Sequence, residues 1–165
     1  MKGRAFFNKN KTQKLITVRT IKYIVIHCTG APGSQSTKSI IDFWKNVKKW
    51  RQVGYHKLIS NDGKVEELAK PEVITNGVAG HNSKAYHICY KGGQYGKDSR
   101  TPEQKVSLLD EVRKAKAKWP NAKIVGHRDL SPDKNADGII SPNEWTKDCP
   151  SFDVKQWLKD AGIKN

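Results

Sequence analysis

Apolar residues occur in short runs separated by polar, helix-like stretches, and the runs have the character of β-strands. Tyr23–Gly30 (YIVIHCTG) is β-branched and continuously apolar, which is typical of a central strand covered on both faces. Ala85–Gly93 and Ala122–His127 are also apolar and predict two further strands. Between Gly54 and Leu68, Asn-Asp-Gly separates two strand-like runs, which predicts a β-hairpin.

Three stretches have apolar residues at helical spacing and predict helices over Ser36–Gln52, Thr101–Lys118 and Phe152–Ala161. The second stretch opens with Thr-Pro-Glu-Gln, which supplies an N-cap, a proline in the first turn and the glutamine of a capping box. We expect this helix to bury Val106, Leu109 and Val112. Gly162 follows the third stretch and predicts its end.

The elements follow one another as strand, helix, hairpin, strand, helix, strand, loop and helix. This order predicts an α/β fold, a single domain in which helices flank a central mixed β-sheet. A chain of 165 residues is long enough for one such domain with its own core. We expect residues 21–165 to form it. Residues 1–20 are polar and lysine-rich, which predicts a basic N-terminal extension with a short edge strand near Leu15–Val18.

The formal net charge of +15 is large for this length. Such a field favours polyanionic partners, namely nucleic acid, an anionic membrane surface or the acidic polymers of a bacterial cell wall. The charge does not choose among these partners, and the sequence has no recognisable nucleic-acid-binding motif. No apolar run approaches the roughly 18 residues of a membrane span, and the first residues do not have the pattern of a signal peptide. We therefore expect a cytoplasmic protein without a membrane span.

Three residues of metal-binding type stand at or beyond the ends of predicted strands. His27 and His127 each close an apolar strand, and Cys149 lies in a polar stretch after the second of them. If the two strands are neighbours, the imidazoles meet at one edge of the sheet. Two imidazoles and one thiolate suit a tetrahedral zinc ion with an open fourth position. The spacing alone leaves open the alternative of two core histidines and a cysteine without a ligand role.

The segment between His127 and Cys149 has the pattern of a calcium-binding loop. Its candidate ligands are Asp133, Asn135, Asp137, Ile139 and Glu144, and a glycine occupies the sharp turn. No amphipathic helix precedes this loop and the sequence has only one such loop, so a paired calcium sensor is not expected. Two alternatives stay open: a structural calcium site that orders the residues after it, and a surface turn rich in Asp, Asn and Gly.

Five motifs resemble those of one known enzyme family and occur in that family's order. They are IVIHCTG, GYHKLI with GKVEE, the Gly80–Asn82 loop before HICYKGG, IVGHRDLSP, and CPSFD. Over roughly Lys22 to Leu158 the chain resembles the zinc-dependent N-acetylmuramoyl-L-alanine amidases, most of all their bacteriophage lysozyme type. The resemblance implies the fold that these amidases share with peptidoglycan recognition proteins.

The resemblance also implies a set of functional residues. It makes His27, His127 and Cys149 the zinc ligands. Tyr55 matches a tyrosine beside the attacking water, and Lys147 matches a lysine that stabilises charge on the scissile carbonyl. The implied reaction is zinc-dependent hydrolysis of the amide bond between N-acetylmuramic acid and L-alanine in peptidoglycan. The alternatives for these two residues are a half-buried strand tyrosine and a solvated surface lysine.

His81 and Asn82 lie in the loop expected beside the substrate groove, and they are candidate substrate-binding residues. Two positions near them depart from the family pattern. Gly77 stands where family members often have histidine, and His87 stands where they tend to have glycine. These departures affect the expected glycan or peptide contacts more than the hydrolytic chemistry. His56 is expected on the face of its strand opposite to the catalytic tyrosine, which predicts a structural role.

The sequence therefore supports a zinc amidase of the phage endolysin class, with two alternatives from other classes. One is a peptidoglycan-binding module of the same fold without turnover. The other is a cytoplasmic regulator that binds a polymerase or nucleic acid. The complete ligand set favours the enzyme over the module, and the charge of +15 suits both wall adhesion and the regulator. We expect a monomer that accumulates in the cytoplasm of the producing cell and acts on the cell wall after release.

Overall fold

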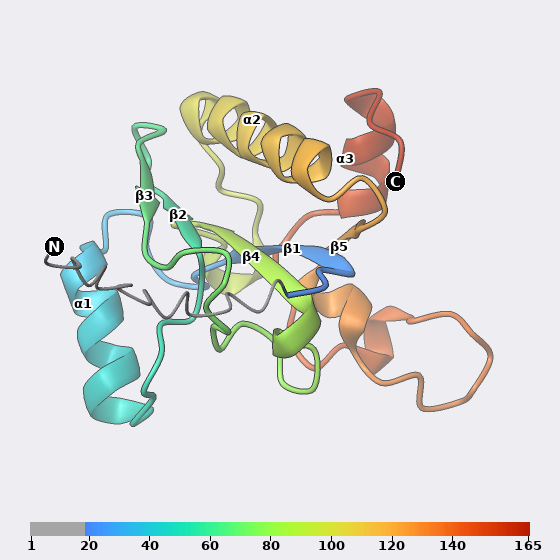
Figure 1. The fold of residues 1–165 in the computed structure, drawn as a ribbon, viewed down its shortest axis with the longest axis horizontal. Coiled ribbons are helices and arrows are strands. Elements are labelled where there is room, and N and C mark those ends of the chain that lie inside the picture. The colour runs from blue at the N-terminus through green and yellow to red at the C-terminus, as the bar shows by residue number, and fades with distance from the viewer. Residues whose placement is uncertain (1–18) are drawn as a thin grey trace, which may run out of the picture.

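The apolar runs form a five-stranded sheet in the computed structural model, which describes residues 19–165 (Figure 1). The strands are β1 (Tyr23–Cys28), β2 (Lys57–Ile59), β3 (Val65–Glu67), β4 (Ala85–Tyr90) and β5 (Lys123–Gly126). The predicted hairpin is confirmed by the antiparallel pairing of β2 and β3. The edge strand predicted near Leu15–Val18 and most of the extension predicted over residues 1–20 lie outside the described residues.

Strand β1 lies at the centre of the sheet, whose order is β3-β2-β4-β1-β5. It runs parallel to both β4 and β5, and β2 runs parallel to β4, whereas β3 is antiparallel to β2. The prediction of a mixed α/β sheet is confirmed. In the register of β1 and β5, Ile26 pairs with Gly126, so the next residues lie side by side: His27 is still within β1, and His127 directly follows β5.

Helices cover both faces of the sheet. α2 (Pro102–Lys118) and α3 (Val154–Asp160) lie over one face and enclose the main core, and α1 (Thr37–Asp42) lies over the other (Figure 1). Neighbouring residues of β4 show the division, because Ile88 packs into the main core and Cys89 packs under α1. Within residues 19–165, no helix is both long enough and apolar enough to span a bilayer.

The first predicted helix is shorter than expected. α1 ends after 6 residues, a π-helical turn follows over Phe43–Val47, and Lys49 adopts a left-handed conformation with a φ of 56°. The predicted continuation to Gln52 is wrong, because the left-handed residue ends the helix and turns the chain. After this turn Trp50 stacks on Trp44, with 6.3 Å between the ring centroids. The shorter helix thus places a second tryptophan beside the first.

The second predicted helix has the expected start and a different buried face. The Thr101 hydroxyl accepts the Gln104 N–H, and the Gln104 side chain accepts the Thr101 N–H, so the capping box is confirmed. Val106 is 69% exposed and Leu109 is only half-buried, so their predicted burial is wrong. The buried stripe runs instead through Gln104 and Leu108. The helix is rotated so that Gln104 faces the core, because its buried side-chain amide donates to two main-chain carbonyls at 2.8 Å and 3.2 Å.

Candidate metal centre and adjoining cleft

Three side chains from distant parts of the chain meet at the carboxyl end of β1. His27 Nδ1 lies 3.2 Å from His127 Nδ1 and 3.8 Å from Cys149 Sγ. The three ligand atoms lie within 4.8 Å of one another, and residues 19–165 contain no other such group of His, Cys, Asp or Glu. His27 is 1% exposed and Cys149 is 7% exposed, so both are buried, whereas His127 is half-buried. The structure thus brings together all three candidate zinc ligands.

The fold positions each of these side chains separately. His27 belongs to β1, and His127 opens the 3-10 turn that directly follows β5. Cys149 reaches the cluster because its segment docks on both strand ends. Its carbonyl accepts the Arg128 N–H at 2.8 Å, and its sulfur accepts the Cys28 N–H at 3.3 Å. Main-chain hydrogen bonds therefore hold the thiol against both histidines.

The geometry of the cluster fits a tetrahedral zinc ion. With Zn–N of about 2.05 Å and Zn–S of about 2.3 Å, tetrahedral angles place two nitrogens roughly 3.3 Å apart and a nitrogen and a sulfur roughly 3.6 Å apart. The two separations from His27 Nδ1, 3.2 Å and 3.8 Å, are close to these values, and the third, between His127 and Cys149, is within 4.8 Å. Two imidazoles and a thiolate are also ligands that zinc prefers, and three protein ligands leave a fourth position open. The residues present therefore fit a catalytic zinc site.

Burial sets the protonation of the three side chains. It lowers the pKa of His27 well below its usual value. It also lowers the pKa of His127 to about 4, with a second contribution from the positive charge of Lys147. Both imidazoles are therefore neutral at neutral pH, which is the form that binds a metal. Because burial raises the pKa of the Cys149 thiol, the proton that a metal displaces at this cluster is the one on sulfur.

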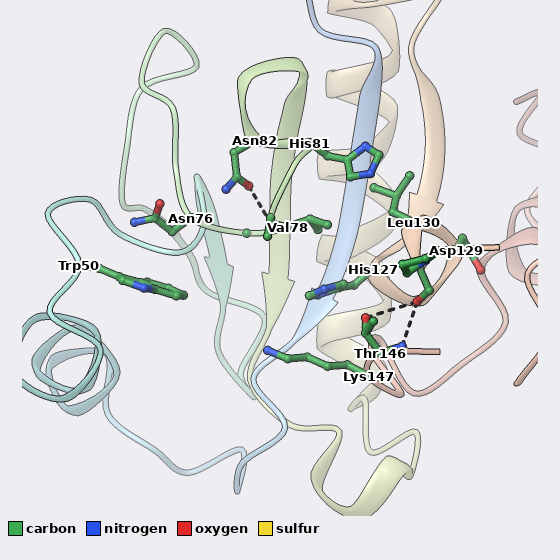
Figure 2. Close-up of a pocket in the computed structure, with 14 residues that line it drawn as sticks. Trp50, Asn76, Val78, His81, Asn82, His127, Asp129, Leu130, Thr146 and Lys147 are labelled. Carbon is green, nitrogen blue, oxygen red and sulfur yellow. Dashed lines mark hydrogen bonds between the residues drawn. The ribbon is translucent and has the colours of Figure 1, made fainter. Parts of the chain in front are cut away.

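A cleft of about 750 Å³ opens beside the cluster, within the range of roughly 300–1,000 Å³ found for ligand pockets. Figure 2 shows Trp50 and His127 on opposite walls, with Lys147 extending into the space between them. The Trp50 wall includes Asn76, and the His127 wall continues through the turn that carries Leu130. One side of the candidate metal centre is thus open to a ligand.

Tyr55 and Lys147 lie next to the metal cluster. Together with His127 and Cys149 they line a hollow of about 170 Å³. The Tyr55 ring centroid lies 4.9 Å from that of His27. Burial raises the pKa of the Tyr55 phenol well above its usual value, so the phenol keeps its proton and is a hydrogen-bond donor. Lys147 is exposed. A proton donor and a cation therefore stand beside the cluster, and their catalytic roles stay predictions.

His81 and Asn82, the candidate substrate-binding residues, both line the cleft (Figure 2). The Asn82 side-chain oxygen accepts the Val78 N–H at 2.7 Å, so this amide shapes the loop. The His81 ring packs edge-on against Tyr23, with 5.7 Å between the ring centroids. Each side chain has a structural contact of its own, and substrate binding by either stays a prediction.

The structure adds residues that the sequence did not place in the site. Trp50 forms a wall of the cleft, and its position depends on the left-handed turn at Lys49. Gly77 and His87, the two unusual positions noted in the sequence, are neighbours, because a Cβ atom at Gly77 would lie 2.4 Å from His87 Nδ1. His56 is buried, and its Nδ1 accepts the His87 main-chain N–H at 3.0 Å. In the sequence, Gly77 and His87 were noted only as two separate departures from the family pattern. A single sequence does not show that the two residues are in contact.

Hydrogen bonds within the chain close the predicted calcium loop. Glu144 is 2% exposed, and its carboxylate accepts the main-chain N–H groups of Ser141 at 2.9 Å and Lys134 at 2.8 Å. These hydrogen bonds, first of all that from Ser141, lower the pKa of Glu144 to about 2. Asp133 Oδ2 accepts a loop N–H at 2.7 Å, whereas its Oδ1 is buried without a partner among the described residues. The loop therefore has an internal brace.

The other three calcium candidates, Asn135, Asp137 and Ile139, are exposed. The Asn135 side-chain oxygen accepts the Asp137 N–H at 3.1 Å, and an Asp137 carboxylate oxygen accepts the Ile139 N–H at 2.8 Å. The loop carboxylates form no close group of ligand atoms within residues 19–165. This arrangement gives calcium binding no support, and it stays a prediction from the sequence.

Comparison with known proteins identifies one family model and related sequences. Residues 17–151 match the family model described as N-acetylmuramoyl-L-alanine amidase. The endolysin of Escherichia phage T7 is 30% identical over 139 residues, which cover 81% of this chain and 83% of that relative.

Solved structures show the same fold. The Ph2119 endolysin from a Thermus scotoductus bacteriophage is similar with a TM-score of 0.71 at 23% identity, over 92% of this chain and 93% of that chain. Bumblebee PGRP-SA is similar with a TM-score of 0.68 at 16% identity, over 87% of this chain and 84% of that chain. These similarities confirm the predicted fold, which resembles that of peptidoglycan recognition proteins.

Proposed function

The chain belongs to the N-acetylmuramoyl-L-alanine amidase family, and we propose that it uses a zinc ion held by His27, His127 and Cys149. It is a hydrolase of the phage endolysin type, and its reaction is cleavage of the amide bond between N-acetylmuramic acid and L-alanine in peptidoglycan. The observation that carries the zinc proposal is a complete ligand set that lies beside an open cleft.

Each residue at the centre has a role in this proposal. A zinc ion bound there supplies Lewis acidity, which polarises a carbonyl and activates water at neutral pH. Lys147 places its positive charge where the oxyanion forms as the scissile carbonyl becomes tetrahedral. The Tyr55 phenol keeps its proton and donates a hydrogen bond to the same oxyanion. His27 and His127 are neutral and hold the metal, so they are not the proton donors of the reaction.

Substrate binding is assigned to the cleft between Trp50 and His127. The flat apolar face of an indole suits the ring of a sugar, and an amide substrate must reach the metal centre beside Lys147. His81 and Asn82 contact substrate from the rim in this proposal. The net charge of +15 favours adhesion to the anionic polymers of the bacterial wall, so the charge concentrates the enzyme at its substrate.

The alternatives of other classes have less support. A peptidoglycan-binding module without turnover does not require a complete ligand set next to a cation and a proton-bearing phenol, whereas this chain has all of them. A regulator that binds a polymerase or nucleic acid is favoured by the net charge alone. It is compatible with amidase activity in the same chain.

The setting of the activity follows from the same proposal. Residues 21–165 are the catalytic domain, and residues 1–20 form a basic extension to it. The protein acts as a monomer, accumulates in the cytoplasm of the producing cell and reaches the cell wall after release. Calcium binding in the Asp133–Glu144 loop is a proposal from the sequence alone, in which the ion orders the residues before Lys147 and Cys149.

Incubation with purified peptidoglycan tests the function directly. We expect the wild-type protein to release new L-alanine amino termini, and we expect Cys149→Ser to release none above background. Release of reducing sugar ends instead of amino termini means a glycosidase and overturns the amidase assignment. Equal release by both proteins removes Cys149 from the catalytic centre and overturns the zinc proposal.

A further inference from the structure

The candidate zinc ligand His27 has a buried imidazole partner behind it. His27 Nε2 lies 3.0 Å from His87 Nδ1, whereas the other ring nitrogen, Nδ1, faces His127 and Cys149. His87 is fully buried on β4, and the two ring centroids are 5.1 Å apart with 61° between the ring planes. His87 is not a member of the metal cluster. His87 therefore contacts the candidate ligand His27 and is not a candidate ligand itself.

Metal binding through Nδ1 of His27 dictates the direction of this hydrogen bond. A neutral imidazole carries one N–H, so a His27 ring that gives its Nδ1 lone pair to a metal carries its proton on Nε2. That N–H must donate to His87 Nδ1. His87 then accepts with Nδ1 and carries its own proton on Nε2. A single metal ion thus sets the tautomers of both rings.

This arrangement leaves a buried nitrogen of His87 without a partner. His87 Nε2 makes no hydrogen bond within the part of the chain that the structure describes. An unpaired buried N–H disfavours folding, so an apolar side chain of similar size at this position suits the fold better than histidine. The fold by itself does not account for a histidine here. The contact of its other nitrogen with His27 does account for it.

Two neighbours hold the His87 ring in this position. Gly77 lies against it, because a Cβ atom there would be 2.4 Å from His87 Nδ1 and 2.5 Å from Cγ. Any side chain at Gly77 would push the imidazole away from His27. His56 stacks on His87, with 5.8 Å between centroids and 17° between planes, and accepts its main-chain N–H. The other nitrogen of His56 lies 3.0 Å from the Val73 carbonyl oxygen, so His56 is itself fixed.

We infer that His87 is a positioning residue for the zinc ligand His27: it accepts the Nε2–H of His27 and holds that ring with Nδ1 toward the metal. Gly77 is needed because it leaves room for the His87 imidazole. This inference rests on the proposed zinc centre. Partners of this kind, one step out from the ligands, typically change metal affinity by about 10–100-fold when they are removed.

Zinc affinity of the full-length protein, measured by competition with a chromophoric chelator, tests the inference. His87→Leu removes the acceptor and keeps an apolar side chain, and His87→Asn restores an acceptor oxygen near the place of Nδ1. Gly77→Ala keeps His87 and displaces it. The matched controls are Ile88→Val, a buried change on the opposite face of β4, and Gly33→Ala, where a Cβ lies 2.4 Å from the Asn61 amide instead.

We expect His87→Leu and Gly77→Ala to bind zinc about 10–100-fold more weakly than the wild type. His87→Asn and both controls should bind as the wild type does. The metal-free melting temperature of His87→Leu should not fall below that of Ile88→Val, because the fold loses an unpaired polar atom. Gly77→Ala carries the test if His87→Leu does not fold.

The outcomes separate this inference from the function proposed above. A wild-type protein that binds no zinc overturns the proposed centre, and the inference with it. A wild-type protein that binds zinc, together with equal zinc affinity in His87→Leu, overturns the inference alone. A loss in His87→Asn as large as in His87→Leu also overturns it, because the acceptor is then not what matters.

Discussion

Polar side chains are used in opposite ways in the metal cluster and in the loop that separates two of its members. In the cluster, His27 and Cys149 are 1% and 7% exposed, and their ligand atoms face one another. In the Asp133–Glu144 loop most residues are exposed, and the carboxylates of Asp133 and Glu144 accept main-chain N–H groups. Ligand-type residues are frequent in both regions, and only one region gathers them into a site.

The difference follows from how the main-chain hydrogen-bonding groups are paired in each region. Parallel strands already pair the main-chain groups around His27, so its side chain is left to contact other side chains. No sheet pairs the N–H groups of the loop, and short carboxylate and amide side chains take over that task. A cluster that spans 122 residues of sequence is therefore a better metal site than five candidates within one loop.

The largest effect is expected from Cys149→Ser, which breaks the cluster and leaves the loop intact. A hydroxyl is a much poorer zinc ligand than a thiolate. We expect peptidoglycan cleavage to fall about 10³-fold or more, with loss of bound zinc measured by metal analysis. Cys89→Ser is the matched control, because Cys89 is buried under α1 and lies outside the cluster. Full activity in Cys149→Ser without zinc contradicts the role given to the cluster.

The next largest effect is expected from Lys147→Ala, beside the cluster, and the comparison is with Lys134→Ala in the loop. Lys147→Ala should lower kcat about 10²–10³-fold, which is the usual loss when one group that stabilises an oxyanion is removed. Zinc affinity should not fall, because the positive charge of Lys147 disfavours a nearby cation and its removal does not weaken metal binding. Lys134→Ala removes an exposed lysine of the loop and should leave kcat unchanged. Equal losses in both variants mean that net charge, and not position, is what matters.

These two regions also show what a sequence alone can predict here. The strands that end at His27 and His127 are visible as apolar runs, and their pairing follows once the strands are taken as neighbours. Cys149 lies in a polar stretch far from either strand, so its residue type made it only a candidate, and the resemblance to a family made it an expected ligand. The contact between Gly77 and His87 depends on how a loop folds back on β4, which one sequence does not encode as a pattern. The same holds for the left-handed turn that brings Trp50 into the cleft.

A smaller effect is expected from Glu144→Gln, which breaks the brace of the loop and leaves the cluster intact. The glutamine amide keeps one acceptor oxygen and presents its NH2 to the other of the two donors, Ser141 or Lys134, so at least one hydrogen bond is lost. We expect faster hydrogen exchange at those two amides, unchanged zinc binding and a smaller loss of activity than in Lys147→Ala. Asp110→Asn, an exposed acid on α2, is the matched control and should change neither amide.

Acid should weaken the brace of the loop in the same way as Glu144→Gln does. The hydrogen bonds hold the pKa of Glu144 at about 2, below its usual 4.5, so the carboxylate stabilises the loop above pH 4.5. This contribution is lost as pH falls from 4.5 through about 2. The protection factors of the Ser141 and Lys134 amides, measured against intrinsic exchange at each pH, should therefore fall over that range in the wild type and not in Glu144→Gln. If Glu144→Gln shows the same pH-dependent change as the wild type, another group controls the loop.

The smallest effect is expected from calcium, and it tests whether the contrast between the two regions is complete. Bidentate ligation by Glu144 requires its carboxylate to leave the main-chain donors, so binding of the ion competes with the existing brace. The buried Oδ1 of Asp133, which has no partner among the described residues, is a loop oxygen that an ion would satisfy without such competition. At a calcium concentration about ten times the Kd, linkage adds about 1.4 kcal/mol. The melting temperature should then rise by roughly 3–6 °C, and Asp133→Asn should abolish the rise. If a calcium-selective chelator changes neither melting temperature nor activity while zinc is retained, the loop is a surface turn without a calcium ion. In that case the acidic residues serve the main chain alone, and the cluster of His27, His127 and Cys149 is the only candidate metal site among the described residues.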